Sequence, residues 1–283
     1  MPVSLSPALE LSLDLLCCPA CRTRHLHPVR GALRCPVGHT FDIARHGYAG
    51  LLTGTRATSG DDAAMVRARS RFLSTGAYAP IREVGARLAV DTAPEQATVV
   101  DVGCSTGYYL AGVLDRLPDA RGLGLDTSVR ALRSAARAHD RGAAVAWDVF
   151  RPFPLADGVA NVVLNVFAPR NPAEFRRVLR PTGRLIVVCH TARHLAELRD
   201  RLPAMVTIDP VKERRLHRAL DLFFEAAATE EVEYSAALTR LDALDLVAMT
   251  PSARHVSRAD LNNDGFLPDQ VTVSVLATAY RPR

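Results

Sequence analysis

The segment that most constrains the fold is Thr98–Leu110, which reads TVVDVGCSTGYYL. Its first residues are β-branched and apolar, as a buried parallel strand requires, and Asp101 ends that run. Gly103 to Gly107 then turn the chain into a helix that starts near Tyr108. A strand that passes through small residues into a helix N-terminus places backbone N–H groups where a polar cofactor binds. The sequence therefore predicts an α/β fold with a ligand site after this strand.

The glycine spacing of this turn narrows the class of ligand. The turn reads G-x-x-x-G, whereas dinucleotide folds prefer G-x-G-x-x-G, whose third glycine allows close approach to a pyrophosphate. The G-x-x-x-x-G-K-[ST] pattern of a P-loop is absent as well. A tight strand-to-helix turn without any ligand remains the alternative interpretation.

A second acidic residue lies where nucleotide-binding folds hold a ribose. Arg121–Asp126 is typical of a short strand that ends in an acid, and it follows the loop by about twenty residues. Asp126 is therefore predicted to accept hydrogen bonds from sugar hydroxyls, with a plain helix cap as its alternative role. Thr127 or Ser128 can cap the helix that is expected over Val129–His139.

Four candidate metal ligands occur in two pairs near the start of the chain. Cys18-x2-Cys21 and Cys35-x3-His39 are separated by thirteen residues, and each pair lies in a turn with Pro or Gly. Three thiolates and one imidazole satisfy tetrahedral Zn²⁺ and leave no open position, so the predicted site is structural. Cys17 is the spare cysteine, and a redox C-x-x-C is the competing interpretation. So small a module needs the metal for its stability.

Composition limits the remaining classes of function. The chain has 283 residues and a net charge of +5, which arginine carries almost alone because Lys212 is the only lysine. Arginine suits phosphate, but high-GC codon usage favours it too, so the bias only weakly indicates RNA. No run of eighteen apolar residues and no basic n-region occur, so neither a membrane span nor a secretory signal is expected. Six cysteines, mostly near the start, favour reduced thiols or metal and a cytoplasmic location.

From the zinc pairs onward the chain resembles a known family. The motifs that carry the resemblance are Phe41–Leu52 (FDIARHGYAGLL), Gly60–Arg69, Phe72–Tyr78, Asn165–Arg170, His194-Leu195 and Met249–His255. Together they are similar to those of the RlmA/TlrB-type 23S rRNA (guanine-N1) methyltransferases, and they cover nearly the whole chain. Phe-Ala-Pro-Arg and Pro-Ser-Ala-Arg-His resemble the tylosin-resistance branch more than the enterobacterial one. The glycine turn resembles the first motif of class I S-adenosylmethionine (SAM) methyltransferases.

The resemblance implies a class I fold, with a mostly parallel, seven-stranded, Rossmann-like sheet and a small N-terminal zinc-binding module. It implies SAM and structural Zn²⁺ as cofactors, and methylation of guanine N1 in a hairpin loop of 23S rRNA domain II. Macrolide resistance and a homodimer are further implications. We expect residues 1–52 to form the zinc-binding RNA-recognition module, 53–95 a linker and helices, and 96–283 the methyltransferase domain.

The predicted cofactor site combines the glycine turn with the ends of other strands. In class I methyltransferases the acid or loop after the third strand, here Ala143–Asp148, meets the adenine. Trp147 is then either packed on that ring or part of the core. The residues predicted to bind SAM are Asp101, Gly103, Ser105, Thr106, Gly107, Tyr108, Asp126, Asp148 and Asn165.

No catalytic base stands out in the sequence. Asp61, Asp62 and Asn165 are candidates for removing the N1 proton only because they lie in family motifs, and each is equally interpretable as a cap or turn residue. Two glycines of the family pattern are replaced, by Ser105 within the loop and by Thr182 after a proline. A side chain at Ser105 narrows the approach to the cofactor.

Further elements are expected outside these motifs. Helices are predicted over Ala63–Leu73, Tyr78–Val90, Glu174–Leu179, Arg193–Leu202 and Pro210–Thr229. Strands are predicted over Val159–Val166, Arg184–His190, Leu241–Met249 and Gln270–Tyr280. Thr53–Asp61 is rich in Thr, Ser and Gly and is expected to link the zinc module to the catalytic domain.

Three other functions remain open on the sequence alone. One is a SAM methyltransferase that acts on a small metabolite, with the zinc module as a lid. Another is a SAM- or RNA-binding homologue that has lost catalysis, for which Ser105 and Thr182 are the support. The third is a zinc-dependent nucleic-acid-binding module without chemistry, against which the glycine turn and Asp126 argue.

Overall fold

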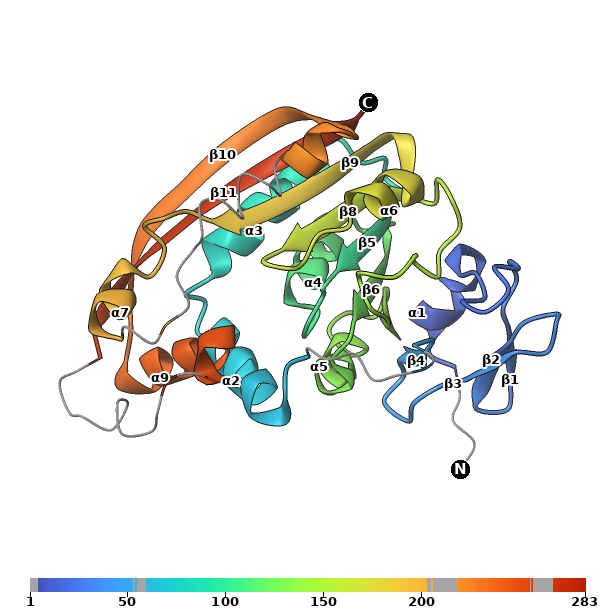
Figure 1. Ribbon diagram of the computed structural model, residues 1–283, viewed down its shortest axis with the longest axis horizontal. Coiled ribbons are helices and arrows are strands. Elements are labelled where there is room, and N and C mark those ends of the chain that lie inside the picture. Colours follow the sequence, from blue (N-terminus) through green and yellow to red (C-terminus); the bar gives the residue numbers. More distant parts are fainter. Residues whose placement is uncertain are drawn as a thin grey trace.

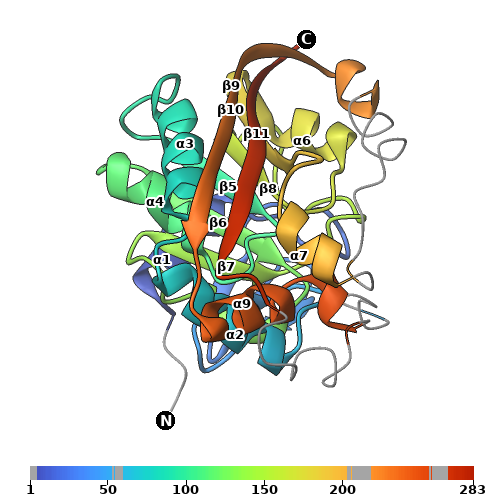
Figure 2. The same ribbon diagram turned by 90° about the vertical axis from the view of Figure 1, so that its left-hand side faces the viewer.

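The computed structural model describes residues 5–52, 54, 60–202, 205, 218–254, 256 and 267–283. Within them, one sheet has eight strands in the order β10-β11-β9-β8-β5-β6-β7-β4, and a separate small sheet lies near the N-terminus (Figure 1). Helices cover both faces of the large sheet, with α3 and α4 on one side and α6 and α7 on the other (Figure 2). The described residues therefore form the layered α/β class that the glycine turn predicts.

The centre of the large sheet is parallel. Its strands are β9 (Leu179–His190), β8 (Ala160–Val166), β5 (Thr98–Val102), β6 (Arg121–Asp126) and β7 (Gly142–Ala146). The long strands β10 (Phe224–Ala237) and β11 (Gln270–Pro282) pair antiparallel at one edge, and β4 (Ala49–Gly50) pairs parallel with β7 at the other. The seven strands from β5 onward confirm the predicted class I sheet, and β4 adds an eighth from the N-terminal part.

Several helices begin at a side chain that caps their first turn. Asp62 precedes α2 (Ala63–Ser74) and accepts hydrogen bonds from the N–H groups of Ala64 and Met65 at 2.7 and 2.9 Å. The other helices are α1 (Pro7–Glu10), α3 (Ala79–Val90), α4 (Tyr108–Arg116), α5 (Val129–Ala135), α6 (Pro172–Val178), α7 (Ala196–Arg201) and α9 (Arg240–Ala248). None of the helices described is both long enough and apolar enough to span a bilayer.

Two predictions near the C-terminus are wrong. The expected strand over Leu241–Met249 is helix α9, which a capping box between Thr239 and Asp242 begins. The expected helix over Pro210–Thr229 is helical at 218–221 but becomes strand β10 from Phe224, and its residues 210–217 lie outside the described residues. Short apolar runs do not separate the two types, and β10 is decided by its pairing with β11.

Smaller differences lie at element ends. α5 ends at Ala135 rather than at His139, and β7 ends at Ala146, so Trp147 and Asp148 belong to the loop beyond it. Of the expected linker Thr53–Asp61, residues 53 and 55–59 lie outside the described part of the chain. Boundaries of this kind depend on caps and pairing that periodicity does not report.

The N-terminal part packs directly on the large sheet. Its small antiparallel sheet contains β1 (His27–Val29), β2 (Ala32–Arg34) and β3 (Thr40–Asp42). The N–H of Cys17 donates to the carbonyl of Pro154 at 2.9 Å, and Arg22 Nη1 donates to the carbonyl of Phe153 at 2.7 Å. Cys17, Phe153 and Leu155 belong to one buried apolar cluster. The two parts of the chain therefore share a core.

The turn after β5 needs glycine at its first position. Gly103 has a φ of +82°, and a Cβ atom there would lie 2.3 Å from the Cβ of Ala168 in the loop after β8. Left-handed backbone disfavours any side chain, and an added methyl group would push the two loops apart. Gly103 thus keeps the ends of the neighbouring strands β5 and β8 in close contact.

Gly103→Ala is expected to lower the free energy of unfolding by about 2–4 kcal/mol, because a left-handed backbone penalty adds to the clash with Ala168. Gly76→Ala is the matched control, since Gly76 also has a φ of +82° but open space where its Cβ would stand. It should lose only about 1–2 kcal/mol. Urea unfolding measures both losses, and equal losses would show that the clash is relieved without cost.

Candidate functional site

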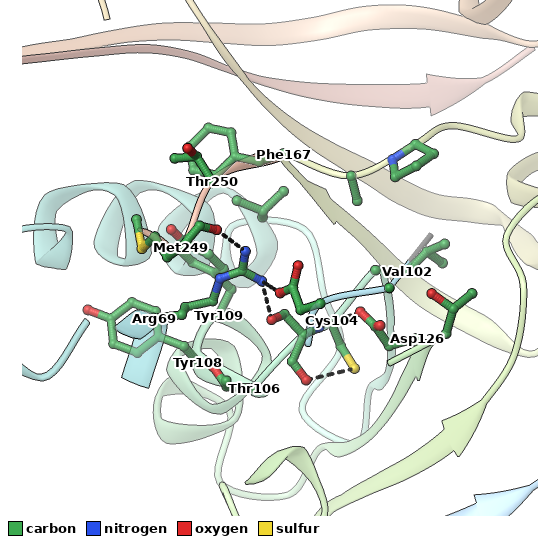
Figure 3. Close-up of a pocket in the computed structure, with 18 of the residues that line it drawn as sticks. Arg69, Val102, Cys104, Thr106, Tyr108, Tyr109, Asp126, Phe167, Met249 and Thr250 are labelled. Atoms are coloured by element: carbon green, nitrogen blue, oxygen red, sulfur yellow. Dashed lines mark hydrogen bonds and ion pairs between the residues drawn. The ribbon is translucent and has the colours of Figure 1, made fainter. Parts of the chain in front are cut away.

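A cavity of about 500 Å³ lies at the carboxyl edge of the parallel strands. Residues that follow β5, β6, β7 and β8 line it, together with the last residue of β9. Arg69 on α2 and Met249 and Thr250 after α9 close it on another side (Figure 3). Ligands of open α/β sheets bind at this edge, and the volume suits a small organic molecule.

Most of the predicted SAM-binding residues meet at this cavity. Those in its lining are Gly103, Ser105, Thr106, Tyr108, Asp126 and Asp148. Gly107 lies just before α4 as its N-cap, with a φ of +82°. The predicted turn and the two predicted acids, Asp126 at the end of β6 and Asp148 after β7, therefore lie around one cavity.

Asp101 and Asn165 lie beneath the cavity rather than in its lining. Burial, and then the nearby charge of Asp126, raise the pKa of Asp101 to about 8. Asn165 Nδ2 donates to the carbonyls of Val102 and Pro169 at 3.2 and 3.0 Å. Asn165 therefore braces the ends of β5 and β8 against each other, and its place in a family motif does not reveal this.

The carboxylate of Asp126 holds the glycine turn in place. Its Oδ2 accepts from the N–H of Ser105 at 2.8 Å, and its Oδ1 accepts from the N–H of Ser128 at 2.7 Å. Burial raises the pKa of Asp126, and these two hydrogen bonds oppose that shift. Ser105 has a φ of +47°, a left-handed backbone conformation that favours glycine. Each carboxylate oxygen keeps acceptor capacity for a sugar hydroxyl.

Trp147 and Asp148 form the wall beyond β7. Trp147 is 5% exposed and belongs to a core cluster, yet it also lines the cavity. The two interpretations of Trp147 therefore do not exclude each other. Asp148 Oδ1 accepts from the N–H of Phe150 at 3.0 Å, which fixes the carboxylate at the cavity wall. Contact of this pair with an adenine ring stays a prediction.

Arg69 is a cavity residue to which the sequence assigned no role. Its Nη1 pairs with the carboxylate of Asp61 and donates to Ser105 Oγ, and its Nη2 donates to the carbonyl of Met249 at 2.6 Å (Figure 3). The guanidinium thus joins three segments around the cavity. The motif Gly60–Arg69 was the sequence feature that pointed to Arg69, but a motif does not show which groups a side chain contacts.

Aromatic side chains line the other end of the cavity, and these were also missed. They are Tyr78, Tyr109, Phe167, His190 and His194. Burial, with smaller effects of nearby positive charge, lowers the pKa of His190 to about 4 and that of His194 to about 2. Both rings are therefore neutral at pH 7. In the sequence, the position of His190 at the end of a predicted strand was the feature that could have indicated its place at the cavity.

The four predicted metal ligands come together in the N-terminal part. The donor atoms of Cys18, Cys21, Cys35 and His39 all lie within 4.8 Å of one another. The separations are 3.8 Å for Cys21 Sγ to Cys35 Sγ, and 3.3 and 3.6 Å from His39 Nδ1 to the sulfurs of Cys35 and Cys18. A tetrahedron with ordinary zinc bond lengths has edges of about 3.8 and 3.6 Å, so the donor set fits closed zinc coordination.

Comparison with known proteins identifies the same two parts of the chain. Residues 16–56 match the family described as RlmA, N-terminal, and residues 100–187 match the family described as Methyltransferase domain. These matches and the Cys/His cluster confirm the predicted fold and the predicted cofactors, SAM and structural zinc.

Two curated relatives match over nearly their full lengths. A putative 23S rRNA (guanine-N(1)-)-methyltransferase of Micromonospora griseorubida is 44% identical over 95% of this chain and 98% of its own. The 23S rRNA (guanine(748)-N(1))-methyltransferase of Streptomyces fradiae is 44% identical over 94% of this chain and 96% of its own. The putative 23S rRNA (guanine-N(1)-)-methyltransferase YxjB of Bacillus subtilis is 38% identical over 58% of this chain and 60% of its own.

Cys21→Ser is expected to release the zinc ion, as metal analysis of the purified protein would show, because a serine hydroxyl replaces a soft thiolate ligand. The free energy of unfolding should fall with it, since the N-terminal part shares a core with the sheet. SAM affinity should change less than about threefold, because the described cavity lining starts at Gly60.

Cys17→Ala is the matched control, because Cys17 lies next to the ligands but outside the cluster. It should retain zinc. A loss of SAM affinity in Cys21→Ser as complete as its loss of zinc would contradict the division of the chain at residue 52.

Asp126→Ala is expected to weaken SAM binding by about 1–3 kcal/mol, because charge-assisted hydrogen bonds to the sugar and to the Ser105 N–H are lost. Calorimetric titration with SAM measures the change. Asp157→Ala is the control, since that exposed carboxylate pairs with Arg177 away from the cavity. Unchanged SAM affinity in Asp126→Ala would remove the residue from the proposed site.

Proposed function

The chain belongs to the family of 23S rRNA (guanine-N1)-methyltransferases, and on this premise we propose that it methylates N1 of one guanine in a hairpin loop of 23S rRNA domain II. The observation that carries the proposal is 44% identity over nearly the whole chain, across both the zinc cluster and the cavity. The Streptomyces fradiae relative is named for guanine 748, so the corresponding guanine is the proposed target. Protection against tylosin-type macrolides is the proposed role in the cell.

Methyl transfer breaks a bond of SAM and replaces the N1–H bond of guanine with an N1–CH₃ bond. SAM supplies an activated methyl group when bound; its S–CH₃ bond breaks, an N1–CH₃ bond forms, and the N1 proton leaves. The protein need only hold donor and acceptor in line and exclude water. In this proposal the glycine turn and Asp126 hold SAM. The guanidinium of Arg69, which lies beside Ser105, donates hydrogen bonds to the carboxylate of the methionine part of SAM.

Asp61 is the proposed acceptor of the N1 proton, directly or through water. Of the three candidates, it alone lines the cavity, whereas Asp62 caps α2 and Asn165 braces two strand ends. The ion pair with Arg69 holds this carboxylate at the cavity wall, and a carboxylate oxygen is a group that can accept a proton.

The proposed RNA partner fits the surface chemistry of the N-terminal part. Arg24, Arg30 and Arg34 lie between the two ligand pairs and are exposed, and guanidinium groups bind phosphate well. Bases in a hairpin loop splay readily, so one guanine can enter the cavity without opening a duplex. A homodimer in which two zinc modules flank the RNA, and a cytoplasmic location, complete the proposal.

Primer extension on 23S rRNA from cells with and without the gene tests the function. A methyl group on N1 blocks base pairing, so reverse transcription should stop next to one guanine only when the gene is present. Cells that express Asp126→Ala should show a weaker stop, because donor binding is impaired. Absence of any stop, with folded protein that binds SAM, would refute the proposal, and transfer to a small acceptor would then favour the metabolite alternative.

A further inference from the structure

The order of the strands divides the cavity into two halves. Asp126 ends β6 and Asp148 follows β7, and both strands lie on one side of β5. Phe167 and His190 stand at the ends of β8 and β9, which lie on the other side. The polar groups suited to a nucleoside donor therefore occupy the first half. The second half, at the ends of β8 and β9, lies on the other side of the glycine turn and can hold a second ligand.

That second half is built from stacked aromatic rings. Phe167 and His190 stack with centroids 4.0 Å apart at 13°, and His190 and His194 stack at 4.1 Å and 23°. Tyr109 meets Phe167 edge-on at 6.2 Å. Phe167 has a φ of +54°, a strained backbone for an aromatic residue of the kind that clusters at ligand sites. Such a wall suits a flat aromatic ligand.

Hydrogen bonds hold the ring of His194, whereas the ring of His190 is held by stacking alone among the described residues. The N–H of Ser274 donates to His194 Nδ1 at 3.2 Å, so the proton lies on Nε2, which is 3.2 Å from the hydroxyl of Tyr78. Among the residues that the structure describes, neither ring nitrogen of His190 makes a hydrogen bond, although the ring lines the cavity. A neutral imidazole has one N–H donor, so His190 has a polar group available for a ligand.

We propose that the aromatic half of the cavity, formed by Phe167, His190 and His194, binds the acceptor guanine, and that the ring N–H of His190 donates to its O6 atom. This inference rests on the proposed function. When the N1 proton leaves, negative charge develops on O6, so a donor placed there stabilises the transition state more than the ground state. Adenine carries an amino group in place of O6 and would leave this donor without an acceptor.

Methylation kinetics on an rRNA hairpin fragment test the donor role of His190. His190→Phe keeps an aromatic ring in the stack but removes the N–H group. Its kcat should fall roughly 10–100-fold, as when a single transition-state donor is lost, with the KM for RNA and the SAM affinity changed less than about threefold. His190→Gln restores an N–H donor and should recover at least part of the lost kcat. A wild-type kcat in His190→Phe would overturn the assignment, as would equal losses in both variants.

A second measurement tests the aromatic half without any methyl transfer. The probe is 2-aminopurine riboside, a purine without O6 whose fluorescence is quenched by stacking, added to protein saturated with S-adenosylhomocysteine. Wild type and His190→Phe should quench it saturably, and Phe167→Leu should quench it much less. No saturable quenching by the wild type would overturn the acceptor site. If the wild type quenches the probe yet leaves rRNA unmethylated, the proposed function fails while the purine site stands.

Discussion

The hydrogen bond from the Ser105 N–H to the Asp126 carboxylate is the interaction on which the site depends. It joins the turn after β5 to the end of β6, and the N–H groups of Gly103 and Cys104 reinforce the junction by donating to the carbonyl of Leu125 at 2.8 and 3.1 Å. A buried carboxylate is costly unless it is hydrogen-bonded, so the two backbone donors on Asp126 stabilise both the acid and the turn. Hydrogen bonds within the protein therefore fix the glycine turn next to the cavity.

The same turn is coupled to the loop after β8. Gly103 touches Ala168 so closely that no side chain fits between them, and Asn165 holds the carbonyls of both segments. A shift of the glycine turn would consequently move Phe167, which is next to Ala168 in the chain. The contact thus couples the glycine turn to the loop that carries Phe167, since close-packed interiors transmit displacement.

The N-terminal part illustrates how a small metal module gains stability from its neighbour. Its short strands bury little surface, and the fit of three sulfurs and one imidazole to tetrahedral zinc supplies a local constraint. Beyond that, Leu16 and Cys17 enter the apolar cluster under the large sheet, and β4 extends the sheet itself. Because of this shared core, the proposed RNA-recognition surface is connected to the sheet that carries the cavity.

The local signals of the sequence determined the strand–turn–helix at Thr98–Leu110, the acid at Asp126 and the four metal ligands, because each depends on residues close together in the chain. Only the tertiary structure decided the rest. The strand β10 exists through pairing with β11, Arg69 reaches a carbonyl 180 residues away, and Tyr78 meets His194 across 116 residues. The motif around Asn165 did not reveal its hydrogen bonds to the carbonyls of Val102 and Pro169, because a side chain's partners are set by the packing of distant segments. Spacing and periodicity report backbone geometry over a few residues, whereas the stacking of Phe167, His190 and His194 arises only when separate strands end side by side.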